Sequence, residues 1–215
     1  TSGMEAAFGD VLARNEESSL EYNFSLYEHF LFIVSTFTFG CTIFLVQPFV
    51  MIYTSGVTDI NYSRVVFGVI MSINQFFYCI RLPYQMLVEA AGYFKETRNG
   101  AIFESVMNIV VSIVLVIKFG LVGVAIGTFC AYCFRTFQYA VFCSKHILHN
   151  SILTLIKHIL VSALEIGCVA GVIEILRYNN MFVNIDGYFK WIQFAMVIAI
   201  VFVFLKISII SSLFE

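Results

Sequence analysis

Residues 101–143 read AIFESVMNIVVSIVLVIKFGLVGVAIGTFCAYCFRTFQYAVFC and decide the fold class of this chain. Two apolar stretches, residues 101–117 and 121–143, are separated by only the tripeptide KFG. A helix of about 20 apolar residues crosses a hydrocarbon core about 30 Å thick. Lipid offers the backbone no hydrogen-bond partners, and the short alternating strands of a barrel are not seen. Both stretches are therefore predicted to be membrane-spanning helices.

The rest of the chain continues this pattern. Of its 215 residues, 60% are hydrophobic and only 12% are charged, whereas soluble domains average about 25% charged residues. Apolar stretches long enough to span occur at residues 30–53, 65–90, 101–117, 121–143, 152–176 and 188–210. We therefore predict an all-α, polytopic protein of the cytoplasmic membrane with about six transmembrane helices.

Residues 1–27 differ from the remainder of the chain because charged side chains are mixed with apolar residues at helical spacing, including Met4, Phe8 and Val11. This pattern predicts the end of a preceding helix and then a cytoplasmic interfacial segment. Residues 28–215 are predicted to form the transmembrane unit. Since the chain begins with Thr1, we expect that it belongs to a longer gene product.

Several functional classes have no support in the sequence. The formal charge is −2 and no basic cluster is present, which argues against nucleic-acid binding. The six cysteines lie in apolar stretches, so packing is favoured over disulfides, and the CxxC at Cys130 and Cys133 lacks a second pair that would indicate a metal site. No HExxH, GxSxG, Walker or DxD motif is present. We expect no catalytic residue and no cofactor, and hence no enzyme.

A polar stripe runs along the second predicted span. Asn74, Tyr78, Arg81 and Gln85 are spaced at i, i+4, i+7 and i+11, which keeps them within a sector of about 60° on a helix. Glu89 lies at the edge of this sector. Ionisable groups in a span usually face a cavity or a charged partner, because their insertion costs at least about 2.5 kcal/mol. The stripe therefore marks a candidate site.

The fourth predicted span repeats this arrangement. Tyr132, Arg135 and Tyr139 share one face with Thr128, and Gln138 lies beside it. Shorter polar stripes occur in the third span (Glu104, Asn108 and Ser112) and in the fifth (His158, Ser162 and Glu165). Several predicted spans thus carry polar groups that could converge.

Two interpretations of these stripes are open. The polar groups could satisfy one another between packed helices, with Arg81 or Arg135 paired to Glu104 or Glu89. Alternatively, several aligned stripes predict a hydrated central cavity, and both can hold at once. We expect the cavity. A guanidinium stays charged and matches phosphate or carboxylate with a planar fork of donors, so the cavity would suit an anionic ligand.

Two glycines near the start of the fourth span have the GxxxG spacing. Gly123 and Gly127 lie in the sequence KFGLVGVAIGT, residues 118–128. This spacing permits close approach of two helices, so a packing role is favoured over a ligand role.

A family resemblance is carried by residues 81–145, which read RLPYQMLVEAAGYFKETRNGAIFESVMNIVVSIVLVIKFGLVGVAIGT at 81–128 and RTFQYAVFCSK at 135–145. With the N-terminal TSGMEAAFGDVLARNE, this stretch resembles the C-terminal half of bacterial polysaccharide flippases. These belong to the multidrug, oligosaccharidyl-lipid and polysaccharide exporter superfamily. The resemblance implies two lobes that alternate access around a central cavity, with this chain forming roughly the last six helices. The N-terminal lobe would then be a missing partner.

The resemblance also implies a function: flipping of a polyprenyl-pyrophosphate-linked oligosaccharide across the cell membrane for surface polysaccharide biosynthesis. Arg81 and Arg135 would hold the pyrophosphate. Sugar hydroxyls would meet Tyr78, Tyr132, Asn74, Gln85 and Gln138, and the expected gating or ion-pair residues are Glu89, Glu104 and Asn108. The alternatives are a drug or cation antiporter of the same superfamily, a membrane-embedded enzyme acting on lipid-linked sugars, and an inactive half-transporter.

Overall fold

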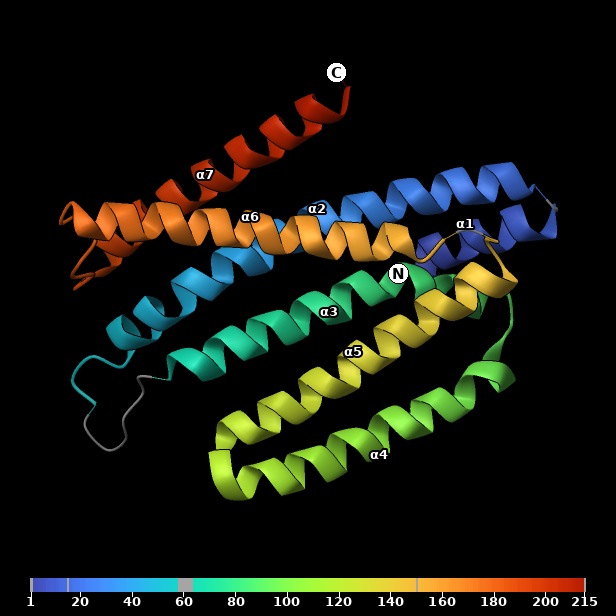
Figure 1. The fold of residues 1–215 in the computed structure, drawn as a ribbon, viewed down its shortest axis with the longest axis horizontal. Coiled ribbons are helices and arrows are strands. Elements are labelled where there is room, and N and C mark those ends of the chain that lie inside the picture. Colours follow the sequence, from blue (N-terminus) through green and yellow to red (C-terminus); the bar gives the residue numbers. More distant parts are fainter. Residues whose placement is uncertain (1, 15, 58–63, 150, 215) are drawn as a thin grey trace.

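The computed structural model describes residues 2–14, 16–57, 64–149 and 151–214, with side chains from residue 3 to residue 208. These residues form helices joined by short connections, without strands in the described ranges (Figure 1). The helices are α1 (Ser2–Ala13), α2 (Glu17–Tyr53), α3 (Val65–Ala90), α4 (Phe94–Phe119), α5 (Leu121–His146), α6 (Leu153–Tyr178) and α7 (Tyr188–Phe214).

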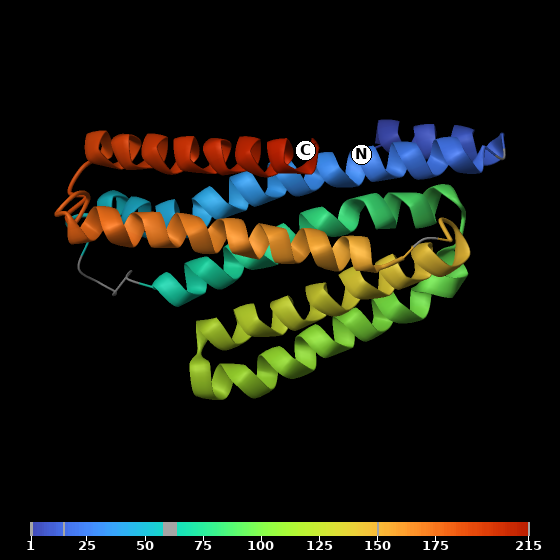
Figure 2. The same cartoon turned by 45° about the horizontal axis from the view of Figure 1, so that its top comes forward.

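Helices α2 to α7 are long and apolar enough to cross a membrane. They run roughly along a common direction, as expected for elements that span the same layer (Figure 2). The prediction of an all-α protein with six membrane-spanning helices is confirmed. The helices extend beyond the predicted apolar stretches, because polar turns continue them: α4 begins at Phe94 instead of residue 101.

The N-terminal segment is more integrated than the sequence suggests. Residues 2–13 form a helix as expected, and α2 already begins at Glu17, within the stretch predicted to be an interfacial segment. Phe8 is 1% exposed and packs against Phe24, with ring centroids 6.2 Å apart. Phe24 in turn meets Tyr84 of α3 at 5.1 Å. These aromatic contacts bury the start of α2 in the core, which explains why it continues as one helix.

Helix α5 packs between α3 and α4, and two glycines bring it close to α4. A Cβ on Gly123 would meet the backbone of Leu115 and Val116, with Val116 N at 2.8 Å. A Cβ on Gly127 would lie 2.8 Å from Ser112 N. The predicted packing role of the GxxxG spacing is therefore confirmed, because only glycine permits this approach.

Helices α6 and α7 pack on α2 through both polar and apolar contacts. The hydroxyls of Thr36 and Ser162 share a hydrogen bond of 2.7 Å, and both residues are buried. Lys206 Nζ of α7 lies 2.7 Å from a carboxylate oxygen of the buried Glu165 on α6. Ser162 and Glu165, which belong to the polar stripe of the fifth predicted span, thus make contacts with neighbouring helices.

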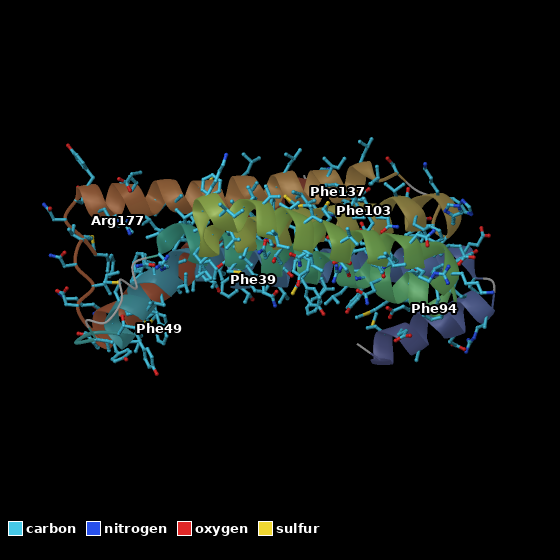
Figure 3. The ribbon with its side chains drawn as sticks, turned by 90° about the horizontal axis from the view of Figure 1, so that it is seen from below. Phe39, Phe49, Phe94, Phe103, Phe137 and Arg177 are labelled. Atoms are coloured by element: carbon cyan, nitrogen blue, oxygen red, sulfur yellow. The ribbon has the colours of Figure 1, made fainter. Side chains whose placement is uncertain are left out.

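Large apolar side chains cover much of the outer surface. On α4 they include Ile102, Val106, Ile109, Val110 and Ile113, each more than half exposed. Figure 3 shows Phe103 and Phe137 on the α4 and α5 side of the molecule, and places Phe49 and Phe94 toward opposite ends. In water such a surface would aggregate, whereas in lipid it is the expected exterior. The chain is a multi-pass membrane protein.

Candidate functional site

Arg81 of α3 lies against two tyrosine rings that also contact each other, with ring centroids 5.9 Å apart. Its guanidinium carbon is 5.0 Å from the centroid of Tyr78 and 5.2 Å from that of Tyr132 on α5. Nη1 donates a hydrogen bond of 2.8 Å to Glu104 Oε1 on α4. The spacing of Tyr78 and Arg81 at i, i+3 puts both on one face of α3, and α5 supplies the second ring. Cation–π contacts and an ion pair therefore hold the same side chain.

Arg135 of α5 uses most of its donors within the protein. Nη1 donates to Thr97 O at 2.9 Å and to Gln138 Oε1 at 2.7 Å. Nη2 donates to the hydroxyl of Tyr139 at 2.6 Å, and Nε lies 3.5 Å from Glu104 Oε2. This arrangement requires the planar fork of arginine, because several acceptors in different directions are met at once.

Glu104 is the point where the two arginines meet. Its Oε1 pairs with Arg81 and its Oε2 with Arg135, so one carboxylate faces two cations from different helices. We call Arg81, Glu104 and Arg135 the arginine–glutamate cluster. It carries one positive charge in excess. The shared carboxylate links α3, α4 and α5 electrostatically.

The arginines do not line an open, water-filled cavity, and that expectation was wrong for this structure. Arg81 is 8% exposed and Arg135 is 4% exposed. The ion-paired interpretation describes them correctly: Glu104 projects from α4 into the space between the two guanidiniums. The physical reason is that a buried guanidinium needs a counter-charge, and a carboxylate on a third packed helix supplies it.

Two parts of this site were missed from the sequence. The backbone carbonyl of Thr97 accepts a hydrogen bond from Arg135. Gly100 leaves room for the amide of Gln138, which a Cβ at that position would overlap. The sequence did contain a signal for Gly100, because it precedes Glu104 by four residues and therefore shares its face of the helix. A backbone acceptor carries no such signal.

The remaining predicted residues make other contacts. Asn74 is 1% exposed and donates to Ala125 O at 3.0 Å, joining α3 to α5. Gln85 donates to Glu89 Oε1 at 2.8 Å, one turn further along α3. Asn108 Oδ1 accepts from Ser112 at 3.2 Å within α4. The hydrogen bonds described for these residues do not join them to the arginine–glutamate cluster, although Asn74 fastens the same two helices.

The chemistry that this arrangement supports is the binding of an anion. Two guanidiniums converge on one carboxylate, with tyrosine rings beside each. Arg81 Nε is buried and has no hydrogen-bond partner among the described residues, so one donor of the cluster is unused there. Among the described residues no group of three or more His, Cys, Asp or Glu could hold a metal ion. The excess positive charge and the spare donor both favour a ligand with more negative charge than Glu104 alone.

Comparisons with known proteins gave no relatives: no protein-family model, curated protein or solved structure matches this chain.

Proposed function

We propose that this chain is one lobe of a transporter that flips a polyprenyl-pyrophosphate-linked oligosaccharide across the cell membrane for surface polysaccharide biosynthesis. The observation that carries the proposal is the convergence of Arg81 and Arg135, from two helices, on the single carboxylate of Glu104. A guanidinium can bind an anion through two hydrogen bonds. Two guanidiniums directed at one position therefore form an anion site within a membrane-spanning bundle. The sequence resemblance of residues 81–145 to polysaccharide flippases suggests which anion is carried.

In this proposal Glu104 acts as an internal counter-ion. While no substrate is bound, its carboxylate neutralises the guanidiniums, which would otherwise be costly to bury. A pyrophosphate carries more negative charge and more acceptor oxygens than one carboxylate, so it can displace Glu104 from Arg81 and Arg135. The release of Glu104 from its helix-to-helix contacts would then change how α4 packs on α3 and α5. This gives Glu104 the gating role expected of it.

The other site residues have assigned places in the proposal. Tyr78 and Tyr132 lie side by side next to Arg81, where their hydroxyls and rings can meet the first sugar beside the pyrophosphate. Asn74, Gln85 and Gln138 supply amides on the same two helices. An N-terminal lobe would close the other side of the path, and rocking of the lobes would alternate access.

Removal of either arginine should stop transport. In a strain lacking the chromosomal gene, complementation with Arg81→Ala or Arg135→Ala in the full gene product should reduce surface glycan at least about tenfold, because each substitution removes a charge-assisted anion contact worth about 1.5 kcal/mol or more. Surface glycan is quantified by immunostaining and normalised to transporter in the membrane fraction. Arg177→Ala, at an exposed helix end, is the matched control.

Replacement of Arg135 by lysine tests whether a positive charge at this position is sufficient for export or whether the planar guanidinium is required. Lysine keeps the positive charge but cannot reach Thr97 O, Gln138 and Tyr139 with one planar fork. We expect Arg135→Lys to retain less than about a third of export. Normal surface glycan in both alanine variants, at normal membrane levels, would contradict the proposal. A gain in drug sensitivity without loss of glycan would instead favour the antiporter.

A further inference from the structure

A groove separate from the arginine–glutamate cluster lies between α2 and α3. Its volume is about 980 Å³, and the start of α5 contributes to its wall. From α2 it is lined by Phe39, Thr42, Val46, Gln47 and Val50, and from α3 by Arg64, Phe67, Gly68, Met71, Ser72 and Gln75, with Gly120 and Leu121 beside them. The lining residues of α2 and α3 lie in the halves of these two helices that adjoin the connection at residues 54–64.

The length of the groove matches one leaflet of a bilayer. On α3 its lining runs from Arg64 to Gln75, and on α2 from Phe39 to Val50. Eleven residues of helix rise about 16 Å, which is about half of a 30 Å hydrocarbon core. Since Arg64 immediately precedes α3, the groove begins at the membrane surface and ends near the middle of the membrane.

The wall of the groove is mainly apolar, although it includes the hydroxyl side chains of Thr42 and Ser72. The hydroxyl of Thr42 donates to Thr38 O at 2.8 Å, and that of Ser72 donates to Gly68 O at 2.9 Å. Both hydroxyls are therefore satisfied within their own helices. The surface left for a ligand is mainly that of Phe39, Phe67 and Met71, which suits a hydrocarbon chain.

One charge stands at the surface end of this wall. Arg64 is exposed, and it is the single charged side chain among the described residues that line the groove. A guanidinium at the level of the headgroups attracts phosphate, and each such cation near a membrane surface contributes about fivefold in affinity for an anionic lipid. The cation at the membrane surface and the apolar slot deeper in the membrane thus match the positions of a lipid phosphate and its acyl tail.

We propose that this groove binds one anionic phospholipid from the surrounding leaflet, with the phosphate at Arg64 and one acyl tail along Phe67 and Met71. The match to a single leaflet favours a phospholipid over a polyprenyl chain, which is longer than one leaflet. The site is independent of the proposed transport substrate, which would bind at Arg81 and Arg135.

The test uses the full chain in nanodiscs that contain equal amounts of phosphatidylglycerol and phosphatidylcholine with identical tails. Native mass spectrometry counts the lipids that stay bound after release from the disc. We expect one retained lipid, with phosphatidylglycerol favoured about fivefold over phosphatidylcholine. Arg64→Gln should bring this ratio close to one. Arg177→Gln removes an exposed cation elsewhere on the surface (Figure 3) and should leave the ratio unchanged.

A second variant tests the slot independently of the charge. Met71 is 43% exposed, so Met71→Trp can fill the groove without disturbing the core, and it should reduce retention of both lipids at least about threefold. Equal retention of the two lipids by the unmodified chain would overturn the proposal, as would an unchanged lipid preference in Arg64→Gln. A dimer that Met71→Trp disrupts would also overturn it, because the groove would then hold a second copy of the chain.

Discussion

Replacing Glu104 by glutamine should lower the free energy of unfolding by about 3 kcal/mol, the lower end of the cost of breaking a buried ion pair from one side. Glu104 is the carboxylate between Arg81 and Arg135. Glutamine has nearly the same shape, so packing is retained while the counter-charge is lost. Both guanidiniums would then be buried with no carboxylate between them. The measurement is reversible unfolding in mixed detergent micelles, monitored by helical circular dichroism.

The matched control is Glu174→Gln on α6, where the same chemical change occurs on an exposed side chain. It should change stability by less than about 0.5 kcal/mol. A double variant adds a sharper comparison. Once Arg81→Met has removed one cation, Glu104→Gln should cost less than it does alone, because the two residues interact. Equal costs of Glu104→Gln with and without Arg81 would show that the ion pair does not stabilise the bundle.

Gly123→Ala should destabilise the protein by about 2 kcal/mol or more, because the added methyl group overpacks the interface of α4 and α5. The Cβ would meet backbone atoms of Leu115 and Val116, including Val116 N at 2.8 Å. Backbone cannot rotate away as a flexible side chain can, so the two helices must separate. That separation would loosen the hydrogen bond between Arg135 and Thr97 O as well. Unfolding in mixed micelles measures the loss.

Gly171→Ala is the control for this substitution. Gly171 is also within a helix, but a Cβ there would have no heavy atom within 4 Å. Alanine should therefore be neutral or stabilise by up to about 1 kcal/mol, through helix propensity alone. A loss of stability in Gly123→Ala no larger than in Gly171→Ala would contradict the close approach of α4 and α5.

Much of the fold can be derived directly from the sequence, because a bilayer restricts what an apolar chain can do. Stretches such as 101–117 and 121–143 must be helices, since lipid cannot satisfy their backbone. The GxxxG spacing predicted a close helix approach, because glycine has no side chain, and the structure shows that the partner is α4. The ends of the helices were harder to predict: the polar residues 95–100, before the apolar stretch 101–117, continue α4 back to Phe94, and hydropathy alone does not detect this.

The candidate site was only partly predictable. Helical spacing put Tyr78 with Arg81 on one face, and their cation–π contact is a consequence of it. The same spacing grouped Gln85 with Arg81, yet Gln85 binds Glu89 instead. The part played by Thr97 was not visible, because the contact uses its backbone carbonyl. Periodicity assigns faces of one helix and does not say which atoms of another helix meet them.

By itself, the sequence determined that this chain crosses a membrane as helices and that arginines, tyrosines and amides lie on defined helix faces. Both properties are local, since they depend on hydropathy and on 3.6 residues per turn. Only the tertiary structure decided that Arg81 and Arg135 share Glu104 and are buried. Whether a charged side chain faces water or a counter-ion depends on the rotation and separation of neighbouring helices, and these arise from packing between segments distant in the chain.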